Sequence, residues 1–224
     1  MILVGLLLFA VVFLGVGWAV STEMFQHRAW RRRVESGDTD IVAALVEEAL
    51  ASWRRGRPPR GTAASLWAGV QAAQLMAVEA SGVTVSTSAQ GEFRAEGAAR
   101  VQVASALDEA IALAARLLDM IMYDVPNLRL GYVRVDVYST FTGADGTPQQ
   151  LPILTVTGDR ATADEMTWEA LTPEEILGRF EANFQRAPNG QPLPIELAPV
   201  PGVAPRPTEQ AAAEFAASLE RRDG

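Results

Sequence analysis

The stretch YVRVDVYSTF, residues 132–141, alternates apolar and polar side chains, which is typical of a β-strand with one buried face. Val133, Val135 and Val137 would face one side of a sheet. The opposite side would carry Arg134, Asp136 and Tyr138. The following GADGT, residues 143–147, is a hairpin turn by composition, and Leu151–Thr157 is apolar enough to return as the partner strand. This part of the chain therefore predicts an antiparallel hairpin.

A long apolar helix is predicted just before this hairpin. SALD, residues 105–108, resembles a capping box, and Pro126 closes the segment. Between them, apolar residues recur at helical spacing over a broad face: Leu107, Ala110, Ile111, Ala114, Leu117, Leu118, Ile121 and Met122. We expect this helix to form the centre of the core.

Three further segments complete the predicted domain. Asp38 begins a helix that ends at Gly56. Gln71–Glu79 and Val83–Arg94 are predicted to pair as a hairpin, followed by a turn over Ala95–Arg100. TPEE, residues 172–175, starts a last helix whose apolar side would carry Ile176, Leu177, Phe180 and Phe184.

The predicted order is α-ββ-α-ββ-α, which favours an α+β fold with an antiparallel sheet covered by helices on one face. We expect this domain to span residues 38–187. Residues 188–224 begin with a proline-rich stretch that is typical of an extended linker or of a peptide lying along the domain. They end in Thr208–Arg222, which is long enough for a short helix.

Residues 1–22 have the pattern of a single transmembrane helix. Ile2–Val20 contains no charged residue and no proline, and 19 helical residues would span roughly 28 Å. Membrane-anchoring side chains would include Ile2, Leu7, Phe13 and, at the interface, Trp18. The alternative is a cleaved signal peptide, for which Ala19-Val20-Ser21 is an acceptable cleavage site.

The basic segment 23–37 predicts the orientation of this helix. It contains Arg28, Arg31, Arg32 and Arg33, whereas Met1 alone precedes the apolar run. The positive-inside rule therefore places the N-terminus outside and the domain in the cytoplasm of a single-pass cell-membrane protein. The same arginines are suited to anionic lipid headgroups.

Composition excludes several classes of enzyme. The chain has no cysteine, all 19 of its basic residues are arginine, and His27 is its single histidine. P-loop NTPases, protein kinases, Schiff-base enzymes and nucleases of the D/E-x-K type need lysine. Ser-His-Asp hydrolases need a histidine in a cleft, and histidine-ligated zinc needs more than one. Carboxylate chemistry is the remaining ordinary option, and we expect no cofactor or metal site.

Charge is distributed unevenly along the chain. Residues 1–35 carry a net charge of +2, residues 36–187 carry −8 and residues 188–224 carry −2. An acidic domain is repelled by the phosphate backbone of nucleic acids, so nucleic-acid binding is not expected. The expected partners are the membrane and another protein.

Five carboxylates are the candidate material for a catalytic or metal-binding site: Asp119, Asp124, Asp136, Asp159 and Asp164. Nothing in their spacing requires them to converge, so a structural role is the favoured interpretation. The sequence therefore predicts a membrane-anchored protein-interaction or accessory (assembly) subunit without catalytic activity. Two alternatives are a membrane-tethered enzyme that uses carboxylates and a divalent metal, and a domain that binds a small ligand between sheet and helices.

Overall fold

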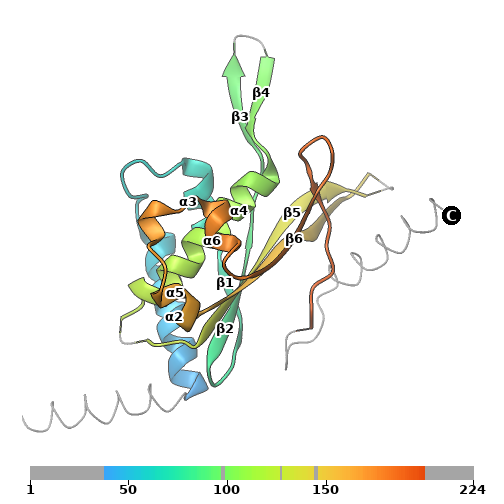
Figure 1. The fold of residues 1–224 in the computed structure, drawn as a ribbon. Coiled ribbons are helices and arrows are strands. Elements are labelled where there is room, and N and C mark those ends of the chain that lie inside the picture. Colours follow the sequence, from blue (N-terminus) through green and yellow to red (C-terminus); the bar gives the residue numbers. More distant parts are fainter. Residues whose placement is uncertain (1–37, 97–98, 127, 144–145, 200–224) are drawn as a thin grey trace, which may run out of the picture.

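The computed structural model describes residues 38–96, 99–126, 128–143 and 146–199, which form an α+β domain with a mixed sheet (Figure 1). The predicted transmembrane segment 1–22, the basic segment 23–37 and the predicted helix Thr208–Arg222 lie outside the described residues. Within the described ranges, no helix has the length and apolarity needed to cross a bilayer.

The main sheet has six strands in the order β1-β2-β5-β6-β7-β8. In chain order, these strands are β1 (Gln74–Val78), β2 (Gly82–Ser88), β5 (Tyr132–Thr142), β6 (Pro148–Asp159), β7 (Glu181–Arg186) and β8 (Pro192–Leu193). A separate two-stranded hairpin, β3 (Glu92–Glu96) and β4 (Ala99–Ala104), projects from the domain (Figure 1). We call this hairpin the arm.

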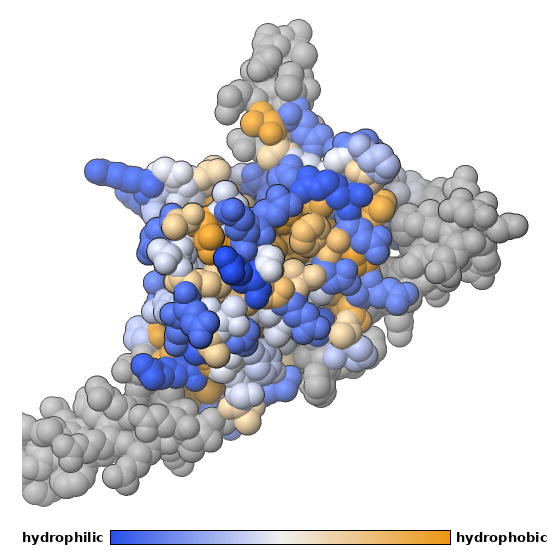
Figure 2. All heavy atoms as spheres, in the orientation of Figure 1, coloured by the Kyte–Doolittle hydropathy of each residue, from blue (hydrophilic) through white to orange (hydrophobic). Residues whose placement is uncertain are grey.

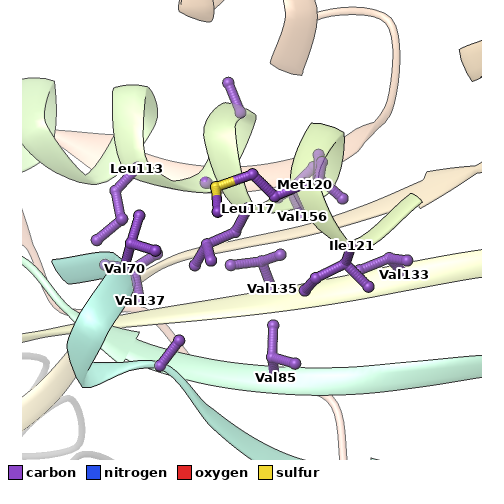
Figure 3. Close-up of a cluster of buried hydrophobic side chains, with 14 of the residues drawn as sticks. Val70, Val85, Leu113, Leu117, Met120, Ile121, Val133, Val135, Val137 and Val156 are labelled. Atoms are coloured by element: carbon purple, nitrogen blue, oxygen red, sulfur yellow. The ribbon is translucent and has the colours of Figure 1, made fainter. Parts of the chain in front are cut away.

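Helices pack on the sheet face that carries the valines of β5. They are α2 (Thr39–Arg55), α3 (Ala64–Ala72), α4 (Ala106–Asp119), α5 (Arg160–Asp164) and α6 (Pro173–Leu177), with a π-helical turn η1 (Met120–Asp124) and a 3₁₀ turn η2 (Trp168–Ala170). Figure 3 shows Leu117 and Ile121 facing Val135 and Val133 across this interface.

Helix ends follow the capping chemistry that the sequence predicts. The side chain of Asp38 accepts a hydrogen bond from the backbone of Asp40 at the start of α2, and Gly56 ends that helix. Ser105 and Asp108 form a reciprocal capping box at the start of α4, as Thr172 and Glu175 do for α6. The predicted helix starts are therefore confirmed.

The prediction of a wholly antiparallel sheet is wrong, because β2 and β5 pair in parallel from Gly82↔Tyr132 to Ser88↔Tyr138. The arm and α4 lie between these two strands in the sequence. They return the chain to the end of the sheet at which β2 starts, so that β5 starts there too. A crossover of this kind returns the next strand in the same direction as the first, whereas a short turn would reverse it. The β5–β6 hairpin is antiparallel as predicted.

Two predicted segments also divide differently. Gln71–Glu79 is the end of α3 followed by β1, and Val83–Arg94 contributes to two sheets, through β2 and β3. The predicted turn Ala95–Arg100 is shorter than expected, because β3 continues to Glu96 and β4 begins at Ala99. The antiparallel pairing of the two segments is confirmed by β1 and β2, whereas the arm is not predicted as a separate unit.

The last predicted helix is shorter than expected. α6 ends at Leu177, and β7 then pairs with β6 from Glu181↔Thr157 to Phe184↔Leu154. Ala182 and Phe184, two residues apart, both pack against the core, which is a strand period rather than a helical one. On the side away from β5, the backbone N–H and C=O groups of β6 need partners. Residues 181–186 supply them by forming a strand instead of continuing the helix.

The proline-rich stretch begins against the domain. β8 pairs with β7, and the backbone N–H of Ile195 donates to the carbonyl of Pro152 at 2.9 Å. The side chain of Ile195 is buried. Up to Ile195, this stretch therefore lies along the domain, as one of the two interpretations of the sequence expects.

Candidate functional site

The structure does not bring the five candidate carboxylates together. Asp119 and Asp124 lie at the end of α4 and in η1, and Asp159 and Asp164 lie at the two ends of α5. Asp136 lies on β5 and alternates with the valines that face α4, so it is on the opposite side of the sheet. Among the described residues, no group of three or more acidic, histidine or cysteine side chains is placed to hold a metal ion.

The surroundings of Asp119, at the end of α4, shift the pKa of its carboxyl. Burial raises the pKa of its carboxyl above the ordinary value, and the negative charges of Asp124 and Glu169 act in the same direction. Arg116 opposes this with an ion pair of 2.7 Å between its Nη1 and Asp119 Oδ2. The arginine partner gives Asp119 a structural role at the end of α4.

Asp164 belongs to a cluster of side chains that connects the π-helical turn η1 to α5. The hydroxyl of Tyr123 donates to Asp164 Oδ1 at 2.9 Å, and the guanidinium of Arg160 lies 4.8 Å from the centre of the Tyr123 ring. Arg160 also donates to the backbone carbonyls of Met122 (2.7 Å) and Leu130 (3.3 Å). Its donors are therefore used within the fold.

Trp168 completes this cluster from η2. Its ring meets that of Tyr123 edge-on, with centroids 5.9 Å apart, and its indole N–H donates to the carbonyl of Ala163 at 3.1 Å. Tyr123 remains about two-fifths exposed, at 42%. π-Helical turns are frequent at functional sites, but the contacts here join parts of one fold.

Arg134, Asp136 and Thr155 form a second polar cluster, on the sheet face away from α4. Arg134 Nε and Thr155 Oγ1 both donate to Asp136 Oδ1, at 2.9 and 2.6 Å. Asp136 is buried, with 3% of its surface exposed. Its position on the face opposite the valines does not make it a solvated carboxylate. Asp136 instead carries a buried charge with a cationic partner on its own strand.

A polar groove of about 940 Å³ lies where the arm joins the domain. Its described lining comes from four separate parts of the chain: Gln90, Gly91, Gln102, Ala106, Ser139, Thr140, Phe141, Thr142, Gln191 and Pro192. Amides and hydroxyls predominate, and none of these residues is ionisable. The groove is therefore suited to neutral hydrogen-bonding groups rather than to charged ones.

Hydrogen bonds hold one wall of this groove in place. Gln191 Nε2 donates to Gln102 Oε1 at 3.0 Å, which joins the β7–β8 turn to the arm. Beside it, Arg186 of β7 forms an ion pair of 2.8 Å with Asp108 in the first turn of α4. A smaller hollow of about 230 Å³ shares Gln102 and Gln191 with the groove.

The sequence gives no indication of this groove. Glutamines and threonines near turns are ordinary surface residues, and those that line it come from positions 90 to 191. Only the return of β5 beneath the arm brings them together. The face shown in Figure 2 is mixed, with hydrophilic residues around small hydrophobic areas.

Comparison with known proteins gives no relative for this chain: no family model matches it, and neither a curated protein nor a solved structure matches it significantly.

Proposed function

We propose that this chain is a single-span membrane protein whose α+β domain binds another protein and serves as an accessory or assembly subunit without catalytic activity. The groove at the base of the arm supports this proposal. General acid–base catalysis needs a titratable group within reach of the substrate, and the described lining of the groove contains none. Amides and hydroxyls recognise polar neutral groups such as peptide bonds.

The arm adds to this argument. A two-stranded hairpin is at best marginally stable by itself in water. Apart from the pairing of its own strands, the arm contacts chiefly the start of α4, and Val103 on β4 is about half exposed, at 49%. A partner that covers the arm and the groove together would stabilise both.

The membrane part of the proposal depends on the sequence. The uncharged run Ile2–Val20, followed by four arginines, supports a retained anchor with the domain in the cytoplasm. A domain held at the membrane surface meets other membrane-bound proteins at a high effective concentration, so even a small interface would be occupied.

Site-specific photo-crosslinking of the full chain in its native membrane tests the proposal. A photoreactive amino acid is placed at Val103 on the arm or at Thr142 in the groove. Glu47, exposed on α2, is the matched control, because α2 packs against β1 and α3 rather than against the arm. We expect the same adduct from the first two positions and none from Glu47.

Two results would contradict the proposal. One is an adduct whose yield is equal at all three positions, because such an adduct reports random collisions. The other is the absence of an adduct at Val103 and Thr142 when the chain is present at its natural level. A binding module of the proposed kind must be close to its partner at these residues.

A further inference from the structure

The groove contains a strand edge that lacks a neighbour in the described part of the chain. β5 extends to Thr142, but its pairing with β2 ends at Ser88↔Tyr138. On its other side, β5 stays paired with β6 from Ser139↔Leu151 to Thr142↔Pro148. Ser139–Thr142 therefore has one edge paired and one edge open, and all four residues line the groove.

The direction of the peptide groups shows which residues face this open edge. The N–H of Ala89 donates to the carbonyl of Tyr138 at 2.8 Å, so the peptide groups of Tyr138 point toward β2. At the hairpin, the N–H of Gly143 donates to Thr147 and so points toward β6. Because peptide groups alternate along a strand, Thr140 and Thr142 point the same way as Tyr138, into the open edge.

We propose that a partner protein binds by adding a β-strand to this edge, with an uncharged, extended segment whose backbone pairs with Thr140 and Thr142. This inference depends on the proposed protein-binding function and specifies how the partner binds. Strand addition obtains its affinity from main-chain hydrogen bonds and its specificity from the side chains beside the edge. Here those side chains are Gln90, Gln102 and Gln191.

The chemistry of the groove identifies the occupant. The groove volume of about 940 Å³ is within the range of pockets that hold drug-sized ligands. With no ionisable residue in the described lining, a charged segment would lose its hydration without a counterion. The chain's own proline-rich stretch is a poor candidate, because proline lacks the N–H that strand pairing needs and Pro192–Leu193 is already paired with β7.

Two substitutions at one position separate the backbone from the side chain. Thr140→Pro removes the N–H from the open edge and places ring atoms in the groove, whereas Thr140→Val keeps the N–H and a side chain of similar shape. Proline is tolerated at strand edges, so both variants are expected to fold with similar melting temperatures. Ala198→Pro, at an exposed position outside the groove, controls for proline itself.

The probe is a library of random decapeptides displayed on phage, selected against the full chain in detergent. We expect the selected peptides to be poor in charged residues. They should bind Thr140→Pro about tenfold more weakly than wild type, as the loss of one or two hydrogen bonds implies. Thr140→Val should bind far better than Thr140→Pro. If the selection yields no binder, or if binders do not distinguish the two variants, the inference is wrong.

Hydrogen exchange on the unmodified chain gives a second test that does not depend on how the variants fold. A selected peptide should slow exchange at the amides of Thr140 and Thr142, and unchanged exchange there would overturn the inference. The two proposals can also fail separately. If Thr142 cross-links a membrane partner equally well with valine or proline at position 140, partner binding stands and strand addition fails.

Discussion

Arg134 and Asp136, two residues apart on β5, form an ion pair of 2.9 Å on the sheet face opposite α4. Thr155 adds a hydrogen bond to the same carboxylate oxygen from the neighbouring strand β6. Within the described residues, Nη2 of Arg134 is buried and has no hydrogen-bond partner. This cluster therefore depends on the charge of Asp136 to compensate a cation that is mostly removed from water.

Asp136→Asn is expected to destabilise the protein by about 3 kcal/mol, because it leaves the Arg134 guanidinium buried without its anion. Urea unfolding of the two proteins measures the difference in free energy. Glu47→Gln, at an exposed position on α2, should change it by less than about 0.5 kcal/mol. Thermal melting of the two proteins, with and without magnesium or manganese, tests the enzyme alternative. A rise of several degrees with metal in wild type, absent in Asp136→Asn, would favour the carboxylate enzyme.

The capping carboxylate of Asp108 predicts a loss of stability in acid. Burial by itself would raise the pKa of Asp108, but hydrogen bonds from Ser105 and Arg186 outweigh it and lower the pKa below its ordinary value of 3.8. A lowered pKa in the folded state means that the stabilisation is complete above the unfolded value and is lost as the pH falls through the folded one. Unfolding free energies of wild type and Asp108→Asn should therefore differ near pH 7 and converge as the pH falls below the lowered pKa of Asp108 in the folded protein. A difference that stays constant with pH would contradict this.

Leu118→Ala tests the position of the core. Leu118 is fully buried in the last turn of α4, and its truncation to alanine should cost about 2–5 kcal/mol of unfolding free energy. Leu193, which is 39% exposed on β8, provides the control, and Leu193→Ala should cost much less. Equal losses in chemical denaturation would mean that the two residues are equally important to the core.

Gly69→Ala tests how closely α3 approaches α4. A Cβ at Gly69 would overlap the side chain of Leu113, which is buried and cannot move aside freely. Overpacking of this kind costs about 1–3 kcal/mol. Gly178→Ala is the matched control, because its backbone has a φ of −64° and its Cβ would come no closer than 3.4 Å to other atoms. Thermal melting should show a large loss for the first variant and little change for the second.

The membrane topology remains a prediction from the arginines at positions 28–33. A reporter that is active only in the cytoplasm, fused after Gly224, should be active. Activity of a reporter that works only outside the cytoplasm would reverse the orientation. A mature chain that begins near Ser21 would show that the apolar run is a cleaved signal peptide.

The sequence predicts some features of the candidate site, and others depend on the tertiary structure. The five acids could be named from the sequence, but their separation could not, because it depends on which sheet face and which helix end each one occupies. The burial of Asp136 depends on the strands around β5. The groove residues have no distinguishing composition, and they become a surface only when Gln90, Gln102 and Gln191 meet the end of β5.

The sequence by itself determined the elements whose bonding is local. Asp38, Ser105 and Thr172 start helices because their side-chain oxygens accept hydrogen bonds from backbone N–H groups two or three residues ahead. The alternation of residues 132–141 and the turn after it are sufficient for the β5–β6 hairpin. Only the tertiary structure decided the parallel pairing of β2 with β5, the strand at Glu181–Arg186 and the open edge at Thr140 and Thr142. Each of these depends on backbone partners far away in the chain, and the local pattern of side chains does not show where those partners are.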